Sequence, residues 1–311
     1  MNSRNFALDI LKIISAIFIV CIHCDFFIEY DKTVSSLTTQ GIFRIAVPIF
    51  FLTNGYYFRH TIERNKIKTW IIRVLILYAV WMFIYSPLWF DLKIKSNVIT
   101  VFVGFFHLWY LKALLICGII MSVIKKINSK HLLVLALILF FIGGIIQYLG
   151  NHHVFKVNTL DQLINTIALY RNFLFLGLPF FVIGYLINKH NWHKNTTKKQ
   201  TIVFIIIGSL LLLIESYINF FFTKETIDIL FSLILICPMI FIFTLELDYK
   251  INFKFIALFS TSIYLIHPWI LTILKMIFIF DATFMALLTI IFSFIISSVI
   301  IKLNTKLKFL L

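Results

Sequence analysis

Long apolar runs separated by short polar segments cover most of the chain. The runs lie at about 7–28, 41–58, 69–90, 108–124, 131–150, 171–188, 201–222, 227–245, 254–278 and 283–303. Each is close to the roughly 20 residues that a helix needs to cross a lipid bilayer. Helices satisfy their backbone hydrogen bonds internally, as lipid requires. The pattern therefore predicts an all-α fold, a polytopic bundle of about ten transmembrane helices, with residues 1–311 forming a single membrane domain.

The composition supports this prediction and excludes other classes of protein. The chain is 61% hydrophobic and 13% charged, whereas soluble domains are about 45–50% apolar and about 25% charged. Its net charge of +15 does not indicate binding to nucleic acid, because the basic residues lie between the apolar runs. All four cysteines lie inside runs, so we expect neither a disulfide framework nor a metal site.

Basic residues concentrate in alternate loops. Lys and Arg are frequent in 59–73, 125–130 and 189–199, which follow even-numbered runs, and near both ends of the chain. Because loops rich in Lys and Arg remain in the cytoplasm, both termini are expected there. The first run is longer than the core of a signal peptide and no small-residue cleavage site follows it, so we expect a retained helix.

The first run carries unusual ionisable side chains. Lys12 and His23 are close to three helical turns apart, so both project from one face, roughly 16 Å apart along the axis. An ionisable group at the centre of a membrane helix costs about 2.5–3.5 kcal/mol. We therefore expect this pair to serve a function.

Several further polar side chains share the depth of His23 in the predicted topology, in the outer half of the bundle. They are Asp25, Arg44, His107, Arg171 with the adjacent Asn172, and Glu215. Because they come from five different helices, we expect a shared, water-accessible cavity that opens outward.

The charged members of this set can be interpreted either as side chains that reach the membrane surface or as partners in an ion pair. Arg44 and Arg171 lie near helix ends, where an arginine can extend its charge toward the lipid headgroups. Glu215 is an isolated carboxylate within an apolar run, and such a group needs a cationic partner. We expect that partner to be Arg44 or Arg171.

The histidines also have structural interpretations. His107 begins the sequence HLWYL, and its aromatic residues, including Trp109, fit a belt at the membrane surface as well as a binding site. His267, in SIYLIHP near the middle of the ninth run, can bind a backbone carbonyl freed by Pro268. The residues alone leave these alternatives open.

Two classes of chemistry fit a histidine beside carboxylates and arginines in a membrane cavity. One is acyl transfer, with His23 as the general base toward an acceptor hydroxyl. The other is proton-coupled transport, with His23 and Glu215 as relay groups. Transporters commonly show an internal repeat or paired broken helices. The sequence shows neither, which favours the enzyme.

Several motifs, taken in order, resemble a known family. They are LDILKIISAIFIVCIH in the first run, FRIAVPIFFLTNGYYF in the second, HLWYLKALL in the fourth, YRNFLFLGLPFFVIGYLI in the sixth, Glu215 in the seventh and SIYLIHPWI in the ninth. Over nearly its whole length the chain is similar to the bacterial acyltransferase-3 family of integral membrane acyltransferases. The resemblance implies a multi-pass protein of the bacterial plasma (inner) membrane. It also implies transfer of an acyl group, usually acetyl, from cytoplasmic acyl-CoA to a hydroxyl of a surface polysaccharide or lipid-linked glycan.

The resemblance further implies roles for individual residues. The family pattern has an arginine, ten residues and then a histidine in the first helix; here Lys12 stands in place of the arginine and His23 matches. It implies catalysis by His23 as general base, with Glu215 and Asp25 beside it. The implied substrate-binding residues are Lys12, Arg44, His107, Trp109, Arg171, Asn172 and His267. Acetyl-CoA is the expected donor substrate, with no permanently bound cofactor and no metal. The alternative is a transporter or exporter of a glycan-related substrate, and a third is a structural partner in glycan assembly.

Overall fold

The computed structural model describes residues 5–155, 157–223, 225–247, 249 and 254–311. These residues form α-helices, two 3₁₀ turns and one π-helical segment, and they contain no β-strand. This confirms the predicted all-α class. The α-helices are α1 (Phe6–His23), α2 (Lys32–Thr39), α3 (Ala46–Glu63), α4 (Ile67–Ile84), α5 (Ser86–Trp89), α6 (Ile94–Val103), α7 (Trp109–Ile124), α8 (Ser129–Asn151), α9 (Asn158–Ile164), α10 (Ile167–Tyr170), α11 (Leu178–His190), α12 (Trp192–Asn195), α13 (Lys198–Phe222), α14 (Leu233–Glu246), α15 (Lys254–Ile277) and α16 (Ala282–Leu307). Two 3₁₀ turns, η1 (Ile42–Ile45) and η2 (Phe106–Leu108), and a π-helical segment, η3 (Phe173–Gly177), adjoin α3, α7 and α11.

Nine helical segments of the described chain are long and apolar enough to cross a membrane. They are Phe6–His23, Lys32–Glu63, Ile67–Ile84, Phe106–Ile124, Ser129–Asn151, Phe173–His190, Lys198–Phe222, Phe255–Ile277 and Ala282–Leu307. These segments match nine of the predicted runs. The eighth run, 227–245, differs, because only the 14 residues of α14 are helical there, fewer than a full span requires.

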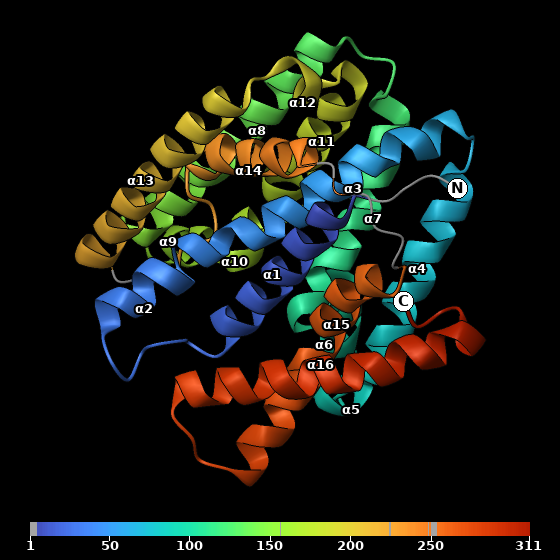
Figure 1. The fold of residues 1–311 in the computed structure, drawn as a ribbon. Helices are drawn as coiled ribbons and strands as arrows, with labels where there is room; N and C mark the ends of the chain where they lie inside the picture. Colours follow the sequence, from blue (N-terminus) through green and yellow to red (C-terminus); the bar gives the residue numbers. More distant parts are fainter. Residues whose placement is uncertain (1–4, 156, 224, 248, 250–253) are drawn as a thin grey trace.

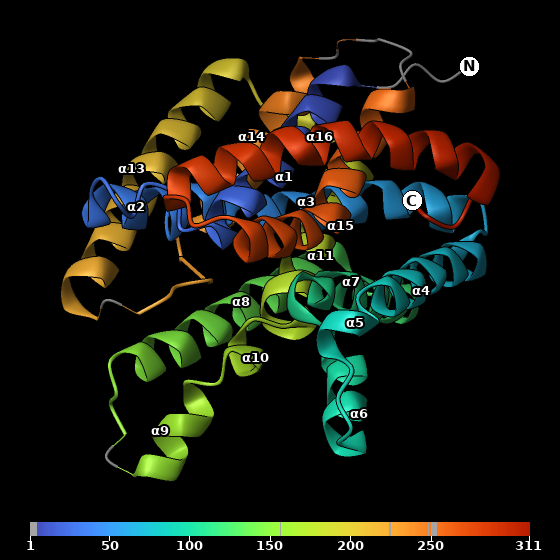
Figure 2. The same ribbon diagram turned by 90° about the horizontal axis from the view of Figure 1, so that it is seen from below.

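The bundle is built around α1 and α3, which lie beside each other near the middle of Figure 1. Helices α16, α15, α1, α3, α11 and α8 form a series in which each packs against the next. In Figure 2, α16 lies toward the top of the molecule, α1, α3 and α15 lie in the middle, and α8, α7 and α4 lie below them. The short helices α6 and α9 project from this lower side.

Helices α3 and α11 approach each other closely through two glycines. A Cβ atom at Gly55 would lie 1.9 Å from the carbonyl oxygen of Phe181, and one at Gly184 would lie 2.1 Å from that of Leu52. Small residues at such crossings let two helix backbones pack directly in a membrane protein. This contact fixes α3, whose first turns carry part of the site described below.

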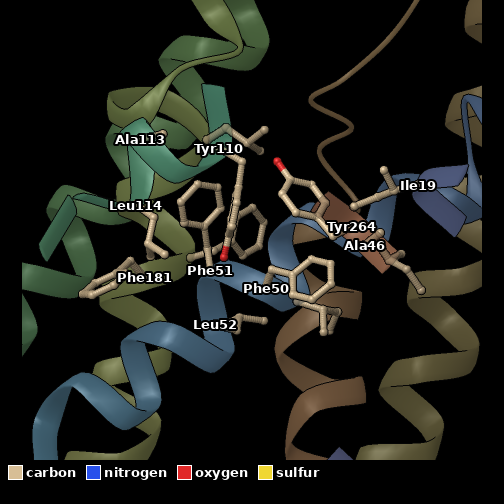
Figure 3. Packing of buried hydrophobic residues seen from close by; sticks show 14 of the residues in the cluster. Ile19, Ala46, Phe50, Phe51, Leu52, Tyr110, Ala113, Leu114, Phe181 and Tyr264 are labelled. Carbon is tan, nitrogen blue, oxygen red and sulfur yellow. The ribbon is translucent and has the colours of Figure 1, made fainter. Parts of the chain in front are cut away.

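Large aromatic side chains fill the core. Phe51, Phe58, Phe180 and Phe181 from α3 and α11 are fully buried. Figure 3 shows Phe51 close to Tyr110 of α7, Phe181 farther to the left below Leu114, and Tyr264 of α15 facing Tyr110. In contrast, α13 and α16 expose many of their apolar side chains, as expected for helices that face lipid.

Candidate active site

A cavity of about 50 Å³, which we call the central cavity, is surrounded by polar side chains from distant parts of the chain. Its polar and aromatic lining includes His23, Arg44, His107, Trp109, Tyr110, Arg171, Asp228 and Tyr264. Five of these residues are among the predicted site residues: His23, Arg44, His107, Trp109 and Arg171. The structure therefore brings together four of the polar side chains that the sequence placed at one depth, namely His23, Arg44, His107 and Arg171.

His23 ends α1 and lies between two cavities. The chain turns immediately after it, since Asp25 adopts a positive φ of 51°. Besides the central cavity, His23 lines a second one of about 420 Å³, here named the Asp25 cavity, together with Asp25, Phe106 and Lys275. Its ring lies 4.4 Å from that of Phe106, centroid to centroid. An imidazole in this position is accessible from both cavities.

Two other imidazoles lie next to His23. The rings of His23 and His267 are stacked with centroids 5.4 Å apart, and His107 lies 5.4 Å from His267. Nδ1 of His267 lies 3.1 Å from the carbonyl oxygen of Ile263, one residue before the carbonyl of Tyr264 that Pro268 deprives of its helix donor. In the described part of the chain, Nε2 of His267 and both ring nitrogens of His107 are buried without a partner.

The two predicted arginines share one carboxylate, that of Asp228. Arg44 forms an ion pair with Asp228 and donates a second hydrogen bond to Gln40. Arg171 donates to the same Asp228 oxygen at 3.5 Å and lies over the ring of Trp109, 5.4 Å from its centroid. The Arg44 side chain is only 10% exposed. Arg44 therefore does not extend to the headgroups, and Trp109 belongs to the cavity wall.

Glu215 lies elsewhere, and the expected ion pair with Arg44 or Arg171 is wrong. Its carboxylate accepts hydrogen bonds from the backbone amides of Phe231 at 2.6 Å and Ser232 at 3.0 Å, and from the Ser232 hydroxyl at 2.8 Å. These groups precede α14, where helix amides lack partners within the helix. The negative charge also suits the positive end of the helix dipole. Glu215 thus anchors the start of α14.

The segment 225–232 can remain irregular because side chains form hydrogen bonds with its backbone amides and carbonyls. Gln147 accepts hydrogen bonds from the amides of Asp228 at 2.8 Å and Ile229 at 3.1 Å, and Asn151 donates to the carbonyl of Thr226 at 3.2 Å. This network holds Asp228 toward the arginines. Our sequence reasoning missed Asp228, although an isolated carboxylate in an apolar run is a usable signal.

A third cavity, about 370 Å³ and lined by Lys12, adjoins the central cavity. We call it the Lys12 cavity; Arg73 also lines it, and Lys12 forms an ion pair with Asp9 at 2.6 Å. Tyr110 and Tyr264 line both this cavity and the central one. Their ring centroids are 5.6 Å apart, and Figure 3 shows the two rings side by side. The tyrosine pair therefore separates the two cavities.

Two predicted site residues have other surroundings. The side-chain oxygen of Asn172 accepts from the amides of Leu174 at 2.8 Å and Phe175 at 3.1 Å, which caps the π-helical segment η3. Asn172 does not line the central cavity. Asp25 is exposed and lines the Asp25 cavity and a further pocket beside Lys32 and Gln40, but not the central cavity.

The arrangement suits chemistry between two substrates that arrive from opposite sides. Lys12 lies in one cavity and Asp25 in another, and the central cavity and His23 lie between them. Unpartnered imidazole nitrogens are available to move a proton or to donate a hydrogen bond. Among the described residues, no group of three or more His, Cys, Asp or Glu side chains could hold a metal ion.

Comparison with known proteins agrees with this picture. Residues 5–303 match the family model of an acyltransferase domain, acyltransferase-3. An "Amino-acid racemase" of Enterococcus faecalis is 25% identical over 99% of this chain and 47% of that protein. A "Serine/alanine racemase" of Enterococcus gallinarum is 27% identical over 86% of this chain and 41% of that protein.

The chain spans less than half the length of these curated relatives. No solved structure matches it. The family model, however, covers nearly all of the chain, and nine described helical segments can cross a membrane. The chain therefore belongs to the acyltransferase-3 family of multi-pass membrane proteins.

Proposed function

We propose that this protein is an O-acyltransferase of the bacterial plasma membrane. It moves an acetyl group from cytoplasmic acetyl-CoA to a hydroxyl of a surface polysaccharide or a lipid-linked glycan. The observation that carries the proposal is the place of His23, which lines both the central cavity and the Asp25 cavity. The central cavity in turn adjoins the Lys12 cavity. Donor and acceptor can therefore reach one imidazole from opposite sides.

The Lys12 cavity is the proposed donor side. Lys12 and Arg73 line it, and the distribution of basic loops predicts that this side faces the cytoplasm. A lysine binds phosphate as a compact point charge, so these residues suit the phosphates of acyl-CoA. The thioester end would then pass between Tyr110 and Tyr264 to reach the central cavity.

His23 acts as the general base in this mechanism. It removes the proton from the acceptor hydroxyl while that oxygen attacks the thioester carbon. As the carbon–sulfur bond breaks, the leaving thiolate of CoA takes the proton from His23, which restores the neutral imidazole. General base catalysis of this kind typically contributes about 10²–10⁴-fold to the rate.

His107 is suited to stabilise the negative charge that develops on the thioester oxygen. It lines the central cavity, and neither of its ring nitrogens has a partner among the described residues. A neutral imidazole always carries one N–H donor. Donors held ready in a buried site are effective at this task, and removing one typically costs about 10²–10³-fold in kcat.

An acetyl-CoA assay tests the proposal. The full-length protein, purified and placed in lipid nanodiscs, should release CoA thiol from acetyl-CoA and transfer labelled acetyl to an added glycan. His23→Gln should lower the rate at least about 10²-fold, whereas His131→Gln, at an exposed position of α8, should not. The proposal fails if folded wild-type protein neither hydrolyses acetyl-CoA nor transfers acetyl.

A transporter is the second candidate, and the names of the relatives favour it. The two enterococcal proteins are named as racemases of amino acids, and this chain matches less than half of each. A membrane part that carries serine or alanine would serve such an enzyme. Proteoliposomes that accumulate labelled serine or alanine, but do not cleave acetyl-CoA, would establish this function instead.

A further inference from the structure

We propose that the acceptor carries an anionic oxygen group, a carboxylate or a phosphate, near the hydroxyl that is acylated. Arg44 and Arg171 would bind this group in the central cavity. The inference rests on the proposed acyl transfer and adds the chemical class of the acceptor to it.

The first argument is the charge of the cavity wall. Arg44 and Arg171 bring two positive charges, whereas Asp228 brings one negative charge. The side chains of Arg44 and Asp228 are 10% and 6% exposed and that of Arg171 is 29% exposed, so water reaches Arg171 only in part and screens Arg44 poorly. Uncompensated charge is costly in a buried site within a membrane protein. An anionic group on the acceptor would balance it.

The second argument is the unused hydrogen-bonding capacity of the guanidinium groups. The two terminal nitrogens of Arg44 donate hydrogen bonds to Asp228 and Gln40. Its Nε is buried without a hydrogen-bond partner among the described residues. A guanidinium can bind carboxylate or phosphate oxygens with two parallel hydrogen bonds. The buried Nε of Arg44 is therefore a donor that the protein itself leaves unsatisfied.

Arg171 complements Arg44 because its guanidinium group is held in one orientation and its side chain is also partly exposed. Its guanidinium lies over the ring of Trp109, which orients it. Its side chain is 29% exposed and holds Asp228 only through the contact of 3.5 Å. Arg171 can therefore meet an entering anion without losing a strong partner.

Asp228 is not free to leave when the anion binds. Its backbone amide donates to Gln147 at 2.8 Å, and the ion pair with Arg44 is buried. Asp228 thus orients the arginines and lowers their repulsion, and an excess of one positive charge remains. Because His23 lines the same cavity, a group bound here leaves a neighbouring hydroxyl within reach of the proposed base.

The test compares three related probes on the full-length protein in nanodiscs: D-glucose, D-glucuronate and D-glucose 6-phosphate. Binding is measured by ligand-induced thermal stabilisation at constant ionic strength, and release of CoA from acetyl-CoA is followed separately. We expect at least one anionic probe to bind about tenfold more tightly than glucose. The stronger of the two identifies carboxylate or phosphate as the group recognised.

Arg171→Gln should reduce this preference to less than about twofold. The matched control, Arg64→Gln at an exposed position that ends α3, should retain it. Equal binding of glucose and both anions, or a preference that survives Arg171→Gln, overturns the inference. Binding preference without any cleavage of acetyl-CoA would instead overturn the proposed acyl transfer and leave the anion site standing.

Discussion

Arg44 and Asp228 form a buried ion pair although 184 positions separate them in the sequence. Arg44 belongs to η1, directly before α3, and Asp228 belongs to the irregular segment before α14. The pair therefore connects the second apolar run to the eighth and closes one wall of the central cavity.

Asp228→Asn should destabilise the protein strongly. The change would leave Arg44 buried without its counter-ion and next to Arg171, and breaking a buried ion pair costs about 3–5 kcal/mol. Thermal unfolding in nanodiscs should show the loss as a lower midpoint. The double variant Arg44→Gln/Asp228→Asn should recover part of it, because both charges are then removed. If the single variant is as stable as the wild type, the pair does not hold this wall together.

Glu215→Gln should lower stability through the start of α14. Glutamine keeps one acceptor oxygen but turns an amide group toward the donors of Phe231 or Ser232, and an unsatisfied buried donor costs about 1–3 kcal/mol. The variant should therefore unfold at a lower temperature, while the remaining folded protein keeps its KM for acetyl-CoA. A variant of unchanged stability and abolished activity would instead give Glu215 a part in the chemistry.

Tyr110→Ala should widen the passage between the Lys12 cavity and the central cavity. Tyr110, Tyr264 and Phe50 form a cluster with ring centroids 5.6–6.2 Å apart, and Asn54 donates to the Tyr110 hydroxyl at 3.0 Å. Loss of the ring should raise the rate with butyryl-CoA or hexanoyl-CoA relative to acetyl-CoA, by at least about tenfold in the ratio of kcat/KM.

Tyr110→Phe is the matched control for this experiment, because it removes the hydroxyl but keeps the ring. It should retain the selectivity of the wild type. If Tyr110→Ala leaves the ratio unchanged while the protein stays folded, the donor does not pass between these tyrosines.

Gly184→Ala should disrupt the contact between α3 and α11. The new methyl group would lie 2.1 Å from the carbonyl oxygen of Leu52, and overpacking of a tight core typically costs about 1–3 kcal/mol or more. Leu211→Ala, at an exposed position of α13, is the comparison and should have a small effect. Equal unfolding temperatures for the two variants would contradict the close approach of α3 and α11.

The sequence by itself determined the class of fold and most of its elements. Apolar runs of span length can satisfy their backbones in lipid only as helices, so nine of the predicted runs are helices of sufficient length. It also determined which side chains are costly in a membrane, and His23, Arg44 and Arg171 were found for that reason. The prediction that they share a cavity rested only on their similar depth in the predicted topology.

Only the tertiary structure decided which charges pair. Glu215 and Asp228 both lie in apolar runs, and the sequence led us to expect Glu215 beside the arginines. The choice depends on the irregular segment 225–232, whose backbone is satisfied by Gln147 and Asn151 from α8. Hydrophobic periodicity does not show which side chains contact one another across distant segments. The run that reads as an eighth span is therefore shortened to α14, and Asp228 rather than Glu215 reaches the arginines.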